Sequence, residues 1–340
     1  MTIDQATSPA LPTSRRTVLN RVTESRLLGW VGLAVALLAP FVTATNYSLS
    51  VMTSAALFVM LAVGLNIVVG YCGLLDLGYA AFFAIGAYVS GILATKFGWP
   101  LLATVPVVVV AAVVAGIVIG GPTLRLRSDY LAIVTLGFGE IIRITANNLS
   151  ITGGPSGIYG IPGLNVLGLD LSGPVGLYYT CVVIVALAVL GAARLGRSRL
   201  GRAWRFVRED EDAAEAMGIH TYKVKLTAYI AGAVWGGLAG ILFGAQLTAI
   251  SPPSFTFLWS ALILMGVVLG GMGSTPGVVL GAIVISVLPE LLRQAADYRY
   301  FAFGVLLIVV MLFRPQGIWP SHASERPTRQ ERRNAKEVAR

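Results

Sequence analysis

Long apolar stretches recur along almost the whole chain and constrain its fold more than any other feature. The hydrocarbon core of a bilayer is about 30 Å thick, so a helix that crosses it needs about 20 apolar residues. Stretches of this kind begin near residue 27 and recur as far as residue 313. Hydrophobic residues make up 56% of the chain and charged residues only 12%, which is not the balance of a soluble domain. The sequence therefore predicts an all-α polytopic membrane protein.

The apolar stretches predict about eight to ten transmembrane helices, some of them short, re-entrant or broken by glycine. The predicted spans are 27–45, 50–69, 76–95, 101–120, 130–148, 176–193, 226–248, 258–272, 277–292 and 300–313. They form a transmembrane domain, 27–313, between a cytosolic N-terminal tail, 1–26, and a basic cytosolic C-terminal tail, 314–340. The stretch after the polar N-terminal tail lacks a small-residue cleavage site, so we do not predict a signal peptide.

The distribution of Lys and Arg predicts the orientation of the spans. These residues concentrate on the cytoplasmic side of membrane proteins. With the N-terminus inside, only Lys96, Arg143, Arg293 and Arg299 of the 25 Lys and Arg residues fall outside the predicted cytosolic segments. We therefore expect both termini in the cytosol. The net charge of +9 then reflects membrane topology and gives no support to a nucleic-acid partner.

Glycines inside the apolar stretches favour a transport protein over a simple membrane anchor. Small residues allow helices to pack closely, and broken helices are tolerated in a membrane only where protein or a cavity surrounds them. Two glycine-rich stretches share a spacing, Gly70 to Gly73 and Gly270 to Gly273. Transporters are often built from such repeated halves. In a chain with 39 glycines, chance is the alternative explanation.

Three ionisable residues, Asp76, Glu140 and Arg143, lie in or at the edge of predicted spans. Charges at this depth are costly and are functional candidates by default. Glu140 and Arg143 are three residues apart and can form a structural ion pair, whereas Asp76 can instead cap the helix that begins near Ala80. The candidate residues of a translocation pathway are Gly73, Asp76, Gly78, Tyr79, Gly137, Glu140, Gly270 and Gly273.

A polar segment, 194–225, interrupts the apolar stretches and predicts a cytosolic loop with a short capped helix. Acidic residues precede two small ones, Ala213 and Ala214, and Gly218 follows. Such a helix can dock on a cytosolic partner; the alternative is a solvated loop whose acids offset nearby arginines. The chain has no P-loop sequence, so ATP would have to be used by a partner. We predict no catalytic motif, cofactor or metal site.

Four stretches, 70–88, 124–143, 152–158 and 312–318, resemble the LivM-type permeases of branched-chain amino-acid ABC importers. The resemblance implies an ABC importer permease fold and a place in the bacterial cytoplasmic membrane. It also implies four kinds of partner besides membrane lipid: a LivH-like second permease, two ATP-binding subunits of the LivG and LivF types, and a solute-binding protein. Leucine, isoleucine and valine are the expected substrates, although relatives of this family import urea, amides or other amino acids.

In ABC importer permeases a cytosolic helix with a Glu-Ala-Ala, three residues, Gly pattern inserts into a groove on the ATPase. Asp212, Ala213, Ala214, Glu215 and Gly218 resemble that coupling helix, with Asp in the Glu position. The implied mechanism is alternating access driven by the ATPases. A different class, an ion-coupled secondary transporter, would need intramembrane acids arranged to bind Na⁺ or H⁺. A membrane-embedded enzyme would need a nucleophile or metal cluster within the spans.

Overall fold

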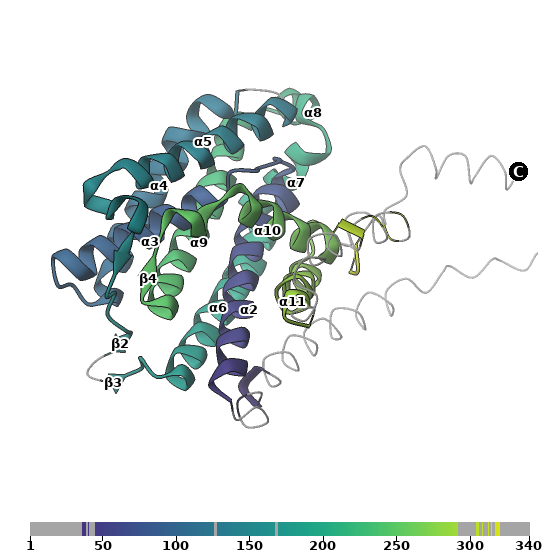
Figure 1. Ribbon diagram of the computed structural model, residues 1–340. Coiled ribbons are helices and arrows are strands. Elements are labelled where there is room, and N and C mark those ends of the chain that lie inside the picture. Colours follow the sequence, from purple (N-terminus) through teal and green to yellow (C-terminus); the bar gives the residue numbers. More distant parts are fainter. Residues whose placement is uncertain are drawn as a thin grey trace, which may run out of the picture. The chain divides into compact units, whose positions relative to one another are not determined.

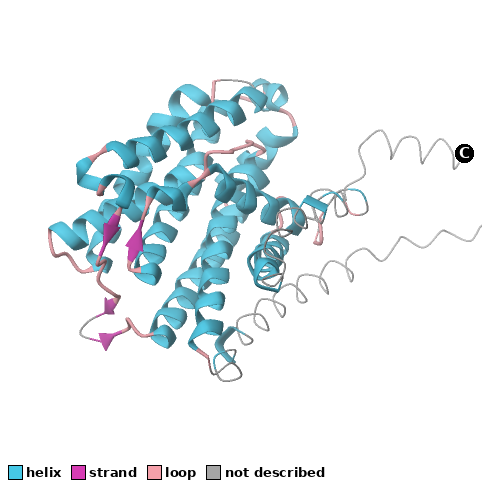
Figure 2. Ribbon diagram, viewed as in Figure 1, coloured by secondary structure: helices cyan, strands magenta, loops and turns pink. Residues whose placement is uncertain are grey.

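The computed structural model describes residues 36–38, 40, 45–125, 128–166 and 169–291, together with 304, 305, 308, 312, 314 and 317–319. Contacts divide the chain into two compact units, Met1–Val42 and Thr43–Arg340, and the elements named below belong to the second. The described part of this unit is mostly helical (Figure 2), as the apolar stretches predict.

The long helices follow the predicted spans closely. Helix α2 continues into a π-helical turn, η1, and helix α4 is preceded by a 3-10 turn, η2. The helices are α2 Asn46–Leu65 with η1 Asn66–Tyr71, α3 Ala80–Lys96, η2 Leu101–Thr104, α4 Val105–Thr123, α5 Ser128–Asn148, α6 Pro174–Arg197, α9 Thr221–Leu247, α10 Phe257–Gly270 and α11 Thr275–Leu291.

Five helical segments of the described residues are long and apolar enough to cross a membrane: Asn46–Tyr71, Leu101–Thr123, Pro174–Arg197, Thr221–Leu247 and Pro252–Gly270. Ala80–Lys96 and Thr275–Glu290 are apolar but shorter. Helix α5 coincides with a predicted span but is not among the five. The predicted spans 27–45 and 300–313 lie almost wholly outside the described residues, so the total of eight to ten stays a prediction.

Helix α9 lies at the centre of the packing, with α3, α4 and α2 against it (Figure 1). Its glycines permit close approach: a side chain at Gly240 would collide with the backbone at Phe83 and Gly86 of α3. Aromatic rings fill the space beside this contact, where Phe83 packs against Phe243 with ring centroids 4.9 Å apart. Helices α10 and α11 form a hairpin that packs on α2. The fold is therefore held by small-residue contacts, which suit helices surrounded by lipid.

The loops gather at two ends of the helices (Figure 1). At one end lie η3 Ser150–Thr152, η4 Gly154–Ser156, β1 Ile158–Tyr159, β2 Asn165–Val166, β3 Leu169–Asp170, β4 Ala249–Ile250 and η5 Pro252–Phe255. Strand β1 pairs antiparallel with β4, with Ile158 opposite Ile250, and β2 pairs with β3. At the other end, α7 Arg199–Glu209 and α8 Glu211–Ala216 connect α6 to α9.

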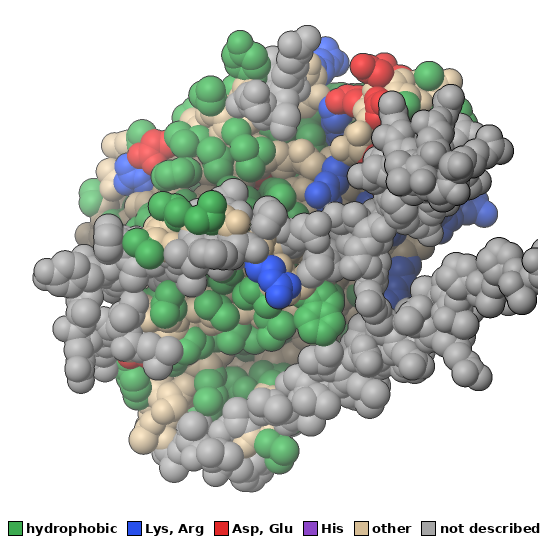
Figure 3. Space-filling model, turned by 90° about the vertical axis from the view of Figure 1, so that its right-hand side faces the viewer, with side chains coloured by type: hydrophobic (Ala, Val, Ile, Leu, Met, Phe, Trp, Pro, Cys, Tyr) green, Lys and Arg blue, Asp and Glu red, His purple; other side chains and the backbone are tan. Residues whose placement is uncertain are grey.

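The surface of the unit suits a bilayer. Large apolar side chains are exposed along α4 and α6, including Val110, Val118, Val183 and Leu187. On the face drawn in Figure 3, apolar side chains cover much of the described surface; most acidic and basic ones lie toward its upper right, and a further acidic and basic pair lies at its upper left. Most of the charge is thus concentrated in one region, as expected where water meets one end of a set of transmembrane helices.

Candidate functional site

The break between α2 and α3 places several of the candidate pathway residues together. After η1 the chain leaves the helical conformation, and Gly73 has a left-handed φ of 76°. Asn66, at the start of η1, is 1% exposed and accepts a hydrogen bond from the Gly273 amide at 2.8 Å. A side chain of this first helix break therefore accepts the hydrogen bond of a backbone amide in a second helix break, which lies between α10 and α11.

The two glycine-rich stretches singled out in the sequence are in direct contact. A side chain at Gly70 would lie 2.5 Å from the Gly273 nitrogen, closer than atoms pack. Tyr71 and Thr275 join their hydroxyls at 2.8 Å in the same region. The predicted glycine-broken segments are therefore present and meet each other. Whether they are repeats of an ancestral half stays a prediction.

Asp76 is fully buried in this break. Its Oδ1 accepts the Gly78 amide at 2.9 Å, while Oδ2 has no hydrogen-bond partner among the described residues. The suggested role as cap of α3 is wrong, because the Ala80 amide at the start of that helix donates to the Ser260 hydroxyl at 2.9 Å. Asp76 instead stabilises the turn before the helix and presents one oxygen to the protein interior.

Gly78 and Tyr79 attach the break to neighbouring helices. A side chain at Gly78 would collide with the Thr135 carbonyl of α5, so α5 packs directly on this backbone. The Tyr79 hydroxyl donates to the Gly232 carbonyl of α9 at 2.9 Å, and the residue is fully buried. Both positions therefore serve close packing, whatever further role they have. Gly270 has the same packing role in the hairpin of α10 and α11, against Gly277.

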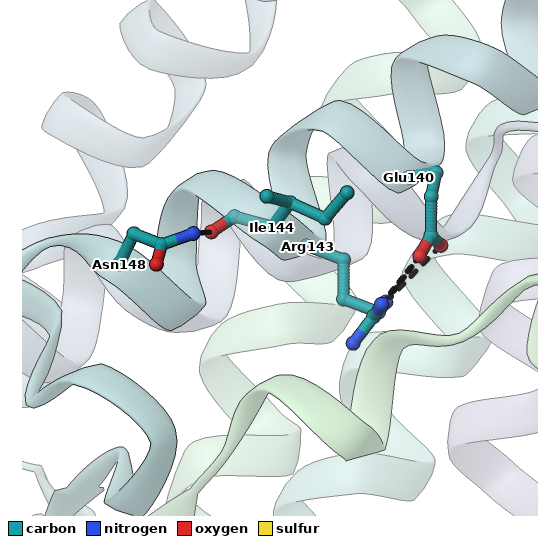
Figure 4. A network of polar contacts seen from close by, with 4 residues as sticks. All are labelled: Glu140, Arg143, Ile144 and Asn148. Atoms are coloured by element: carbon teal, nitrogen blue, oxygen red, sulfur yellow. Dashed lines mark hydrogen bonds and ion pairs between the residues drawn. The ribbon is translucent and has the colours of Figure 1, made fainter.

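Gly137 and Glu140 lie apart from this cluster, on the uncovered side of α5. No atom lies within 4 Å of the position that a Gly137 side chain would take. The Arg143 Nε donates to both oxygens of Glu140, at 2.9 and 3.1 Å, and Nη2 also donates to Oε1 (Figure 4). The predicted pairing of these two residues is confirmed.

Helix α8 is the short capped helix predicted in the polar segment. The Asp210 carboxylate accepts the Ala213 amide at 3.0 Å at its start. At its end, the Gly218 amide donates to the Glu215 carbonyl and the Ile219 amide to the Ala214 carbonyl. This is a Schellman motif, and its left-handed residue is Gly218 with a φ of 80°.

Ala213 and Ala214 of α8 do not share one environment, because Ala213 is only half-buried. Ala214 is fully buried against its own chain, so its small size is needed inside the protein. Asp212 and Glu215 are exposed, as is Gly218. Met217, which the sequence pattern did not single out, is 74% exposed and is the largest apolar side chain on this helix end.

Polar contacts fasten α7 and α8 to the transmembrane helices. Lys225, at the start of α9, is buried and forms an ion pair with Glu211 of α8. The Thr221 hydroxyl donates to Glu215 at 2.7 Å. From α7, the Arg208 guanidinium donates to the Gly70 carbonyl of η1. Burial lowers the pKa of the Arg208 guanidinium, and nearby Glu209 offsets only part of that shift. The guanidinium still stays protonated at neutral pH.

Some of these residues could have been found in the sequence. Asn66 is the lone amide in an apolar run, and such polar groups usually have a specific partner. Arg208 gave no such signal, because it is one of several arginines in a polar segment. Ser260 and Met217 were likewise indistinguishable from ordinary span and loop residues.

A polytopic helical protein with buried helix breaks and a fastened polar helix at one end has the architecture of a transport permease. The chain belongs to the family described as "Branched-chain amino acid transport system / permease component", whose model matches residues 47–312.

Curated relatives agree with this family. The chain is 41% identical over 312 residues to the high-affinity branched-chain amino acid transport system permease protein LivM of Escherichia coli, covering 85% of this chain and 73% of the relative. It is 27% identical to a probable LivM of Methanocaldococcus jannaschii, over 78% of this chain and 90% of the relative. It is also 27% identical to LivH of E. coli, over 78% and 92%. No solved structure was found to match the chain.

Proposed function

We propose that this chain is the permease subunit of an ATP-driven importer that moves branched-chain amino acids into the cytoplasm. The observation that carries the proposal is the 41% identity, over 85% of the chain, to a permease named for high-affinity branched-chain amino acid transport. That extent includes both helix breaks and the polar segment.

The proposed assembly contains a second, LivH-like permease, two ATP-binding subunits and a solute-binding protein that delivers the amino acid. It lies in the bacterial cytoplasmic membrane with tails 1–26 and 314–340 in the cytosol. The concentration of Lys and Arg in the predicted cytosolic segments supports this orientation. ATP hydrolysis belongs to the partner subunits, since the chain has no P-loop sequence.

In the proposed mechanism, α8 docks on an ATPase through its exposed residues Asp212, Glu215 and Met217. Closure of the ATPases on ATP moves α8, and the movement reaches the helix break at Gly70 through Arg208 and reaches α9 through Lys225. The attachment of α7 at Gly70 and of α8 at Lys225 supports this role, because loosely attached helices would absorb the movement. Alternating access then follows from rearrangement around the contact of the two glycine-rich breaks.

The test is reconstitution of the chain with its neighbouring permease, ATPase and binding-protein gene products in proteoliposomes. We expect leucine uptake that requires both ATP and the binding protein. Uptake of urea or an amide in place of leucine would support the importer proposal but change the proposed substrate. Uptake by the chain alone, driven by an ion gradient, would overturn the importer in favour of a secondary transporter.

A further inference from the structure

Helix α5 differs from the other helices of its length. It has 21 residues, enough for about 30 Å, yet it is not apolar enough to count as a span by composition. One side packs against α3 and α4, with Leu131, Thr135 and Ala146 buried there. The helix therefore belongs to the packed unit, and its polar character must be accommodated on the opposite side.

That opposite side is uncovered and carries a charged pair among apolar residues. Ile133 is 68% exposed and Ile144 is 47% exposed, and Gly137 leaves open space between them. The Glu140 side chain lies in the middle of this side and is 43% exposed, and that of Arg143 is 28% exposed. Charged side chains at membrane depth face water or protein rather than lipid. This side of α5 thus borders an aqueous path or a partner subunit.

The pairing of Glu140 with Arg143 leaves hydrogen-bonding capacity on both groups. Glu140 is bound through Nε and Nη2, and Arg143 Nη1 makes no hydrogen bond to any described residue. In Figure 4 one end of the guanidinium points away from the Glu140 carboxylate. The Nη1 and Nη2 edge has the fork geometry that binds a carboxylate through two hydrogen bonds. The Glu140 carboxylate can likewise accept further hydrogen bonds beyond those that Arg143 donates to it.

We propose that Glu140 and Arg143 form a transient binding site for the zwitterionic head of an aliphatic α-amino acid in transit. The substrate carboxylate accepts from the outer edge of Arg143, and the substrate ammonium donates to Glu140. The neighbouring Leu136 and Ile144, both exposed, supply apolar contact for the aliphatic side chain. The opposite charges, a few ångströms apart and bordered by apolar groups, match the charge distribution of such an amino acid. This inference rests on the proposed function and names the residues that recognise its substrate.

The test uses the whole reconstituted complex with loaded binding protein at saturation. We expect Arg143→Gln and Glu140→Gln each to lower the maximal leucine uptake rate by at least about tenfold, as loss of a charge-assisted contact predicts. Copurification of the partners and ATPase activity stimulated by the binding protein should stay close to wild type. Thr145→Val, an exposed position on the same helix, is the matched control and should import normally.

A charge-swapped variant, Glu140→Arg with Arg143→Glu, separates recognition from a purely structural pair. It restores the ion pair but reverses the order of charges relative to Leu136 and Ile144, so we expect uptake to stay low while the complex assembles. Recovery of assembly and uptake in the swapped variant would overturn the proposal, as would normal uptake by Arg143→Gln. A wild-type complex that does not import leucine would overturn the proposed function as well.

Discussion

The Arg208 guanidinium donates a hydrogen bond to the carbonyl oxygen of Gly70, a residue 138 positions earlier in the chain. Gly73 makes room for this arginine, because a side chain there would lie 2.8 Å from the Arg208 Cγ. The contact joins the polar segment of α7 and α8 to the π-helical turn that ends α2. It is a direct contact between the polar segment and the first of the two buried helix breaks.

We expect Arg208→Ala to uncouple ATP hydrolysis from transport. Without the guanidinium, α7 loses its bond to η1 while α8 keeps its ion pair with Lys225. Leucine uptake should fall by about tenfold, the loss of one charge-assisted bond, while the ATPase activity of the complex is retained. Arg199→Ala is the control, since Arg199 is exposed at the start of the same helix. Equal losses of uptake and ATPase activity would count against the linkage.

Replacing Gly218 should impair coupling without removing the permease from the membrane. Gly218 closes α8 with a φ of 80°, and a residue with a side chain pays about 1 to 2 kcal/mol in that conformation. We expect Gly218→Ala to lower ATP-dependent uptake severalfold, with normal amounts of the chain in membranes. Gly98→Ala is a matched control, because Gly98 also has a positive φ, 68°, and open space around it. If both variants import equally, the shape of α8 is not needed for coupling.

A charge at Met217 should block docking more selectively than one at Ala214. Met217 is 74% exposed, so Met217→Glu leaves the fold intact, whereas a charge at the buried Ala214 would disrupt α8 itself. We expect Met217→Glu to reduce copurification of the ATPases and to lower uptake at least about tenfold, the range of a truncated interface anchor. Met217→Leu should behave as wild type. Full ATPase recovery with Met217→Glu would place the docking surface elsewhere.

Asn66 should contribute to stability through the Gly273 amide. Asn66→Leu removes the acceptor of a part-buried hydrogen bond and leaves that amide unpaired, at a cost of about 1 to 3 kcal/mol. We expect a lower melting temperature of the detergent-purified chain. Thr53→Val is the control, because Thr53 is equally buried in α2 and its hydroxyl only adds a bond to the Leu49 carbonyl. A smaller effect at Asn66 than at Thr53 would contradict this account.

The helices could be predicted from the sequence because apolar length is a local property. The predicted span 130–148 differs from α5, Ser128–Asn148, by two residues at one end, and the capped helix before Gly218 follows from its own residues. The Glu140 and Arg143 pair was likewise visible, since both lie one turn apart.

The contacts that organise the candidate site could not be predicted in this way. Asn66 and Gly273 are 207 residues apart. Nothing in a single sequence says from which backbone amide a buried asparagine will accept a hydrogen bond. One of the two suggested roles of Asp76, as the cap of α3, was wrong for the same reason, because the Ala80 amide donates to Ser260 from a distant helix.

Strands β1 and β4 pair and so connect two loops that lie about ninety residues apart in the chain. The first loop follows α5 and the second follows α9. Ile158 and Ile250 are held in register, and the Ile161 amide adds a hydrogen bond to the Thr248 carbonyl at 3.0 Å, so separating these two loops would break the contacts. A movement that keeps these contacts would carry α5 and α9 together. The side of α5 that carries Glu140 and Arg143 would then change its orientation whenever the central helix α9 does.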